Sequence, residues 1–173
     1  MEKLKLSFIG NPVLRETAAP VPVVDDSIRG MLGQMEKIMR AESGAGLAAP
    51  QVGKPVRALV FIELKKRGEA GTVHKIINPK IIRASEKKCR MEEGCLSIQG
   101  TDGPVFADVE RPESVEVEYL DEHGQKHARE WSGFAARAVL HEIDHLDGIL
   151  FIDHLSSAKR EMIMRKVKKA AKK

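Results

Sequence analysis

The sequence predicts an α+β fold in which antiparallel sheets pack with helices. Three observations lead to this prediction. Runs of β-branched and apolar residues fill the middle of the chain, helical periodicity appears towards both ends, and strands and helices do not alternate regularly. The 173 residues suit one domain, and no internal repeat or linker divides the range 1–173.

The chain is expected to open with an extended segment followed by a helix. Residues 1–24 contain three prolines, which favours an arm wrapped on the core over a helix. Asp25 or Asp26 can cap the next helix, because a short carboxylate accepts hydrogen bonds from the free backbone N–H groups of the first turn. Apolar residues then recur at helical spacing and predict a buried stripe: Ile28, Met31, Leu32, Met35, Ile38 and Met39.

Strand signals dominate the middle of the chain. A turn is expected at Asn78-Pro79 between two apolar runs, and a hairpin turn is expected over 121–124. The strand that precedes the hairpin alternates apolar and acidic residues, so it should bury one face. The predicted strands are 56–62, 73–77, 81–82, 114–120 and 126–131.

Two further helices are expected near the end. Ser132 or Gly133 starts the first, which Gly148 ends, and Ser156 can cap a basic C-terminal helix within residues 155–173. Residues 159–173 carry eight basic residues and one acidic residue, although the net charge of the whole chain is only +4. Such a tail fits either a polyanionic partner or a solvated helix face.

Composition argues for a cytoplasmic protein. The N-terminus lacks the apolar run of a signal peptide, and no stretch is long and apolar enough to span a membrane. The chain has only two cysteines, Cys89 and Cys95, so a disulfide framework is not expected and a reducing compartment fits best. Cys89 is interpreted as a structural or surface thiol.

The segment His141-Glu142-Ile143-Asp144-His145 indicates a metal site in the second of these helices. Two histidines four positions apart lie on one face of a helix, a spacing that suits two ligands of one transition metal. Glu142 follows the first histidine and could take a proton from a water that the metal activates. The competing interpretation is a surface helix with a few polar residues.

A third ligand would decide between these interpretations. The third histidine that one metalloprotease pattern needs is replaced by Phe151, and Glu161 is the only downstream glutamate, in the basic tail. His154 lies past a turn and is more simply an exposed polar residue. Upstream, Cys95 is a good soft ligand once deprotonated. A metallopeptidase with another third ligand, and an RNA-binding module with a structural metal, remain alternatives.

Small residues dominate a further stretch, Gly44 to Gln51. Glycines and alanines leave its backbone open to close approach by another chain, and Gln51 is its only strongly hydrogen-bonding side chain. A plain loop is the simpler interpretation of this stretch alone.

Three stretches together resemble the signature motifs of the peptide deformylases. They are Gly44-x-Gly46-Leu47-Ala48-Ala49-x-Gln51, Glu93-Gly94-Cys95-Leu96-Ser97 and His141-Glu142-x-Asp144-His145, in the order and at separations similar to those of that family. The resemblance extends from the arm at Gly10 to Phe151. It implies a metal-dependent hydrolase that removes the N-formyl group from the initiator methionine of new polypeptides and releases formate.

The resemblance also implies roles for individual residues. Cys95, His141 and His145 would hold one divalent metal, Fe2+ in the cell with Zn2+, Ni2+ or Co2+ able to substitute, and leave a position for water. Glu142 would move the proton, and the Gln51 amide and the Leu96 backbone N–H would stabilise the oxyanion. Asp144 should face away from the metal.

For the substrate, the resemblance implies strand-like pairing of an N-formylmethionyl peptide. The residues expected to contact it are Ala45, Gly46, Gly94 and Arg137, the last lining a methionine pocket with its aliphatic stem. A monomer is expected, with possible ribosome contact through the C-terminal helix and no membrane partner.

One region departs from the family pattern. Gln99 stands where the family has proline, and the loop at 100–104 is about four residues longer by comparison with the pattern. This departure leaves open the substrate contacts on that side and the equivalence of Arg111.

Overall fold

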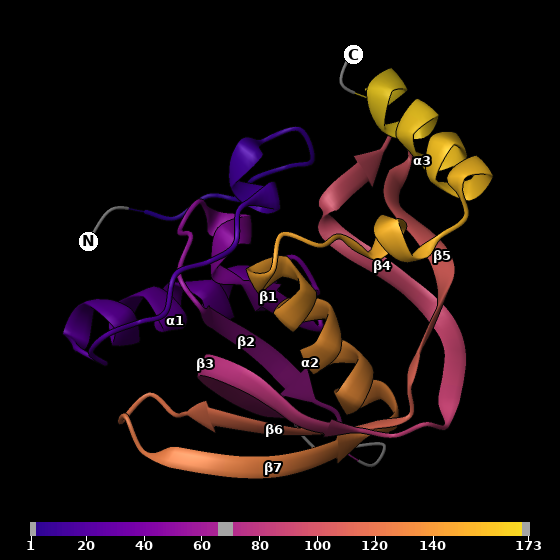
Figure 1. Ribbon diagram of the computed structural model, residues 1–173. Coiled ribbons are helices and arrows are strands. Elements are labelled where there is room, and N and C mark those ends of the chain that lie inside the picture. The colour runs from indigo at the N-terminus through magenta and orange to yellow at the C-terminus, as the bar shows by residue number, and fades with distance from the viewer. Residues whose placement is uncertain (1–2, 66–70, 171–173) are drawn as a thin grey trace.

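The computed structural model describes residues 3–65 and 71–170 and confirms an α+β fold with antiparallel sheets (Figure 1). Five strands form one sheet in the order β1-β2-β3-β6-β7, and β4 and β5 form a second. The bounds are β1 (Gly46–Ala48), β2 (Ala58–Glu63), β3 (Thr72–Ala84), β4 (Lys88–Gly100), β5 (Gly103–Pro112), β6 (Ser114–Leu120) and β7 (Lys126–Ser132).

Helix α2 (Gly133–Leu146) lies over one face of the five-stranded sheet, as Figure 1 shows. The alternating residues of the strands bury their apolar side chains against it, because successive side chains of a strand point to opposite faces. Val115, Val117 and Tyr119 of β6 all belong to this core, together with Val139 and Ile143 of α2.

The N-terminal part follows the predicted order of an arm and a helix. Residues 3–24 contain one 3-10 turn, Pro12–Arg15, and helix α1 spans Asp26–Ala41. Asp25 is its N-cap, and its side chain accepts a hydrogen bond of 3.0 Å from the backbone N–H of Ile28. Four members of the expected stripe are buried and the other two partly so: Met31, Leu32, Met35 and Met39, then Ile28 and Ile38. The ends of the predicted arm (1–2) and of the C-terminal helix (171–173) lie outside the described residues.

The prediction of a turn at Asn78-Pro79 is wrong, because β3 includes both residues. The strand accommodates the proline with an irregularity: Asn78 has a φ of +50°, and the register with β6 shifts between Ile77 and Lys80. The Asn78 side chain accepts a hydrogen bond from the Val21 N–H and donates one to the Val21 carbonyl, both at 2.8 Å. The Asn78 amide therefore connects the N-terminal arm to this bulge. The bulge can contain Pro79, which has no backbone N–H to donate.

The stretch around Cys95, for which the sequence predicted no strand, lies inside the long strand β4. Strands β4 and β5 pair from Lys88 with Pro112 to Gly100 with Gly103, and the pairing is interrupted between Gly94 and Gln99. Their many charged residues hide the strand signal, since both faces are polar over much of their length.

Helix α3 (Ser157–Ala170) packs beside the tip of the β4–β5 hairpin (Figure 1). It follows Ser156, whose hydroxyl accepts a hydrogen bond of 3.4 Å from the backbone N–H of Lys159, as the capping prediction requires. Its buried Ile163 shares a core with β4, β5 and the 3-10 turn Phe151–His154. Within the described ranges, no helix is long and apolar enough to cross a membrane.

Candidate functional site

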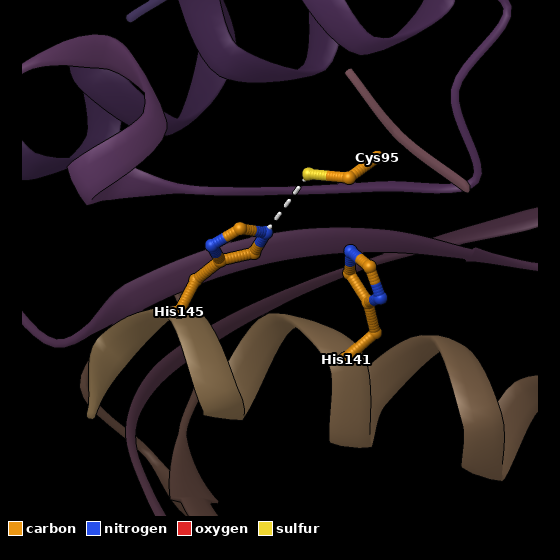
Figure 2. A group of neighbouring side chains, drawn as sticks. All are labelled: Cys95, His141 and His145. Carbon is orange, nitrogen blue, oxygen red and sulfur yellow. Dashed lines mark hydrogen bonds between the residues drawn. The ribbon is translucent and has the colours of Figure 1, made fainter. Parts of the chain in front are cut away.

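Cys95 of β4 and His141 and His145 of α2 come together beneath the surface (Figure 2). One ligand atom from each lies within 4.8 Å of the others, and the Cys95 Sγ is 3.3 Å from the His145 Nε2. All three side chains are buried. The structure therefore brings together the three residues that the sequence predicted as metal ligands.

These three donors fit a single transition-metal ion. A thiolate and two imidazoles are the soft and borderline donors that iron(II) and zinc accept, and three protein ligands leave a fourth position for water or substrate. Among the described residues, no other group of three or more such side chains gathers this closely. The Gln51 Nε2 donates a hydrogen bond to the Cys95 Sγ at 3.5 Å.

His141 is held in place by Glu93. The His141 Nδ1 lies 3.0 Å from the Glu93 Oε2, so the other ring nitrogen, Nε2, is directed away from this carboxylate. A carboxylate behind a ligating histidine fixes both the orientation and the tautomer of the ring. This arrangement leaves Nε2 of His141 as the atom for the metal.

Glu93 also binds two buried guanidinium groups. Arg111 donates from Nε at 2.6 Å and from Nη2 at 3.0 Å, and Arg137 donates from Nη1 at 2.5 Å. Burial alone would raise the pKa of Glu93, but the hydrogen bonds from His141 and Arg111 outweigh it and hold the pKa well below its usual range. Glu93 is therefore a carboxylate that connects β4, β5 and α2.

Sequence reasoning assigned no role to Glu93. Its partners Arg111 and Arg137 are 18 and 44 residues away along the chain, so spacing could not reveal the cluster. The available signal was an acidic residue directly before small and apolar neighbours in the Cys95 motif.

Arg137 lines the cavity, and both terminal nitrogens of its guanidinium group donate hydrogen bonds to β4 or β5. Its Nη2 donates to the Cys89 carbonyl at 2.8 Å and its Nη1 to the Val109 carbonyl at 3.0 Å, besides the bond to Glu93. The Arg137 Nε is buried and has no hydrogen-bond partner among the described residues. Cys89 is half-buried, and its Sγ lies 3.6 Å from the Arg137 Nη2.

Glu142 is a buried carboxylate beside the ligands. Its Oε2 has no hydrogen-bond partner among the described residues, and burial raises its pKa to about 7. The carboxyl lies against β1: a Cβ built on Gly46 would be 2.4 Å from the Glu142 Oε1. A side chain at position 46 would therefore displace this carboxyl.

Gln51 and Leu96 lie on either side of the cysteine. The Gln51 Oε1 accepts a hydrogen bond of 2.8 Å from the Ala48 N–H, which turns the Nε2 towards Cys95 and the Ser97 hydroxyl. The β4–β5 pairing is interrupted between Gly94 and Gln99, so Leu96 has no partner residue on β5. Both groups can therefore donate to an oxyanion near the metal position.

A cavity of about 370 Å³ opens onto this group. Its walls are the segment 42–46 and the segment 92–96 of β4, and its floor is α2. Ala45, Gly46, Gly94 and Arg137, the residues expected to contact substrate, all line it. Strand β1 is an edge strand of its sheet, so its outer side faces a space where another strand could pair.

The other candidate ligands have different partners. The Asp144 Oδ2 lies 2.8 Å from the Arg111 Nη1 and 2.7 Å from the His154 Nε2. Glu161 pairs with Arg165 within α3. Neither supplies the third ligand of the alternative metallopeptidase.

The unusual segment after Ile98 forms the tip of the β4–β5 hairpin. Gln99 donates from Nε2 to the Leu96 carbonyl at 3.1 Å, which closes the irregular stretch beside the cysteine. Gly103 has a φ of +110°, a conformation that favours glycine at such a turn. Pro104 and Phe106 just beyond it line the cavity.

Comparisons with known proteins agree with this site. The family model described as polypeptide deformylase matches residues 3–161. A peptide deformylase of Brucella suis is 45% identical over 166 residues, which cover 96% of this chain and 92% of the relative. A relative from Rhizobium meliloti with the same description is 44% identical over 96% of this chain and 93% of its own length.

Solved structures show the same similarity. The crystal structure of an Ehrlichia chaffeensis peptide deformylase in complex with actinonin has a TM-score of 0.90 at 38% identity and covers all of both chains. An Arabidopsis thaliana deformylase has a TM-score of 0.85 at 32% identity, over 95% of this chain and 88% of that one. With its three motifs gathered around one cavity, the chain belongs to the polypeptide deformylase family.

Proposed function

We propose that this deformylase removes the N-formyl group from the initiator methionine of newly made polypeptides with one divalent metal held by Cys95, His141 and His145. The observation that carries the proposal is the buried Oε2 of Glu142, which has no hydrogen-bond partner among the described residues and belongs to a side chain on the cavity that Cys95 and His141 line. A buried carboxylate without a partner is costly unless it serves a ligand or a reaction.

For the metal in the cell we propose Fe2+, as the resemblance to the family implies. When bound, such an ion would polarise the formyl carbonyl and lower the pKa of the attacking water. Zn2+, Ni2+ and Co2+ also accept one thiolate and two imidazoles. Metal analysis of protein purified without oxygen tests the assignment, and a site filled only by zinc in the cell would reject iron.

Glu142 moves the proton. Its free Oε2 accepts a proton from the attacking water, and the same carboxyl then gives it to the departing amine. The contact with Gly46 fixes this carboxyl through the backbone of β1, so the base needs no other polar side chain to position it.

Gln51 and Leu96 stabilise the negative oxygen of the tetrahedral intermediate. The Gln51 amide and the Leu96 backbone N–H flank Cys95, where the formyl oxygen would lie. Loss of one such donor typically costs about 10²–10³ in turnover. Gln51→Leu should therefore lower kcat more than it raises KM.

The substrate backbone pairs as an added strand along the outer side of β1, from Gly46 to Ala45, with Gly94 on the opposite wall. Main-chain pairing gives affinity with little dependence on sequence, which suits an enzyme that acts on many new polypeptides. The methionine side chain would lie against the stem of Arg137 and Ala138 near His141.

The decisive experiment measures formate release from formyl-Met-Ala-Ser. Wild-type protein and Glu142→Gln, both loaded with metal, are compared, and we expect the variant to lose about 10²–10⁴ in kcat while it retains one metal per chain. Glu122→Gln, which changes an acidic residue far from the cavity, is the control. Equal activity of Glu142→Gln and wild type would overturn the proposal.

The C-terminal helix supports a ribosome partner. Lys168 and Lys169 are exposed on α3, and the same element packs through Ile163 on the hairpin that carries Cys95. We further propose a cytoplasmic location, where new polypeptides leave the ribosome, and a monomeric state. The double change Lys168→Glu and Lys169→Glu should weaken salt-sensitive ribosome binding without changing tripeptide turnover, and unchanged binding would reject this partner.

A further inference from the structure

Ser97 is a fully buried serine that follows Cys95 on β4 and does not line the catalytic cavity. Its hydroxyl accepts a hydrogen bond of 3.2 Å from the Gln51 Nε2. The exposed fraction is 0% for Ser97 and 1% for Gln51, so bulk water does not compete for this bond. The bond therefore joins the proposed oxyanion donor to a side chain behind the cavity wall.

The contacts of the Gln51 amide determine where each of its N–H groups points. Its Oε1 accepts from the Ala48 N–H at 2.8 Å, which distinguishes the oxygen end from the nitrogen end. The amide nitrogen carries two hydrogens. Its two acceptors are the Ser97 hydroxyl at 3.2 Å and the Cys95 Sγ at 3.5 Å. While the hydroxyl holds one hydrogen, the other is directed towards Cys95, where the formyl oxygen would lie.

The N-terminal arm holds the main chain on both sides of this bond. The Ser7 N–H donates to the Gln51 carbonyl at 2.7 Å, and the Ile9 N–H donates to the Ser97 carbonyl at 2.8 Å. The pairing of β4 with β5 is interrupted between Gly94 and Gln99, so the arm supports Ser97 where β5 does not. Gln51 and Ser97, which are 46 residues apart in the chain, are thus fixed to one short segment.

We infer that Ser97 is a positioning residue, whose hydroxyl holds one N–H of the Gln51 amide so that the other N–H is directed at the oxyanion. This inference rests on the proposed function and extends the oxyanion site to a side chain that does not touch the substrate. Without the hydroxyl, a buried N–H loses its acceptor, and the amide can turn away from the position in which it serves the reaction.

The test measures kcat and KM for formyl-Met-Ala-Ser with metal-loaded wild type, Ser97→Ala, Gln51→Leu and the double variant. We expect Ser97→Ala to lower kcat about tenfold, the approximate contribution of one hydrogen bond, and to change KM by less than about twofold. In the Gln51→Leu background, which has no amide to position, Ser97→Ala should change kcat by less than about twofold. A general disturbance of the site would instead lower kcat by the same factor in both backgrounds.

A measurement without turnover follows the side-chain amide protons of Gln51 in heteronuclear NMR spectra of the zinc-loaded protein. These protons give the pair of signals that is missing from the spectrum of Gln51→Leu. An amide proton moves upfield when it loses its acceptor, so one signal of this pair should move upfield in Ser97→Ala.

Ser85→Ala is the matched control. The Ser85 hydroxyl also makes two hydrogen bonds, donating to the Lys87 carbonyl at 2.7 Å and accepting from the Ser114 N–H at 3.0 Å, and Ser85 does not line the catalytic cavity. This variant should keep the wild-type kcat and leave both Gln51 signals in place. Ser97→Gly removes the same hydroxyl and takes the place of Ser97→Ala if denaturation shows that the alanine variant is not folded.

A wild-type kcat in folded Ser97→Ala, or the same fractional loss with and without the Gln51 amide, would overturn the inference. Failure of the proposed function has a different result, namely no formate from the tripeptide with wild type. The two failures are therefore distinguishable.

Discussion

The two sides of α2 are held by different kinds of interaction. Towards the five-stranded sheet, Val139 and Ile143 pack against a core that includes the fully buried Leu59 and Phe61 of β2. Towards β4 and β5, α2 is joined by buried charges, with Arg137 and His141 both bonded to Glu93. One helix thus has an apolar side and an ionic side.

This difference separates stability from site geometry. Apolar packing depends on the area buried and tolerates small shifts, whereas hydrogen-bonded ion pairs act only at defined angles and distances. Cys95 comes from β4 and the histidines come from α2, so the geometry of the metal site depends on how these two elements are aligned. The Glu93 cluster lies at that junction.

Removal of the Glu93 charge should produce the largest effect. Glu93→Gln leaves Arg111 and Arg137 buried without their shared carboxylate, and we expect the free energy of unfolding to fall by about 3–5 kcal/mol. Metal affinity should fall about 10–100-fold, because His141 loses its orienting acceptor. Chemical denaturation and competition with a chelator measure the two quantities.

Glu110→Gln on the exposed side of β5 is the control for this change. Its partner is Lys88 at 3.4 Å, and both side chains are more than half exposed, so stability should change by no more than about 0.5 kcal/mol. If Glu93→Gln behaves like this control, the ionic side of α2 has no special role.

A change on the apolar side should affect stability alone. Leu59→Ala creates a cavity under α2 and should lower the free energy of unfolding by about 3 kcal/mol. The folded fraction should still bind one metal ion with wild-type affinity, which a titration can measure. A large loss of metal affinity would show that the two sides of the helix are not separable.

A smaller effect is expected at the outer end of the charge cluster. Asp144→Asn removes the charge that Arg111 and His154 share, in a position that is only partly buried. We expect a loss of about 1.5 kcal/mol, since a charged hydrogen bond is weakened while the shape is kept. Metal affinity should change less than for Glu93→Gln. An equal loss of metal affinity in both variants would contradict the expectation that the effect becomes smaller with distance from the metal ligands.

The smallest change in the free energy of unfolding is expected for the surface ion pair between Asp153 and Arg15. Burial alone would raise the pKa of Asp153, but its hydrogen bonds with Arg15 and Leu150 lower it below its usual value. The carboxyl therefore stabilises the fold above its unfolded pKa of about 4, and this contribution disappears as the pH falls through the lower folded value.

Asp153→Asn should consequently lower the free energy of unfolding by about 0.5 kcal/mol at pH 7, a small change because solvent screens this exposed pair. The reduction should be smaller at pH 3. Denaturation at both pH values measures the difference. A loss that grows as the pH falls would have the wrong sign.

Local patterns predicted much of this fold and of its site. The caps at Asp25 and Ser156, the alternation in β6 and the four-residue spacing of His141 and His145 are properties of short segments, and the structure contains each of them. Cys95 was a candidate because a thiolate is a good soft ligand, and the resemblance of three motifs to one family then paired it with the histidines.

What the sequence did not predict depends on contacts between distant segments. Pro79 is tolerated in β3 because the bulge at Asn78 is stabilised by the arm, 57 residues away at Val21. The Glu93 cluster likewise depends on contacts of β4 with β5 and α2, which contribute Arg111 and Arg137. Strand β4 was missed because its side chains pair with a second polar strand and do not alternate.

The contact between Gly46 and Glu142 has a consequence for how this enzyme can evolve. The Glu142 carboxyl, for which we propose the acid–base role, is held against main chain, and a main-chain contact cannot be adjusted by exchanging one side chain for another. Even an added methyl group at position 46 would move the carboxylate. Mutations that adapt the enzyme to other temperatures or inhibitors are therefore expected to accumulate elsewhere, and a complete mutational scan should find position 46 restricted to glycine.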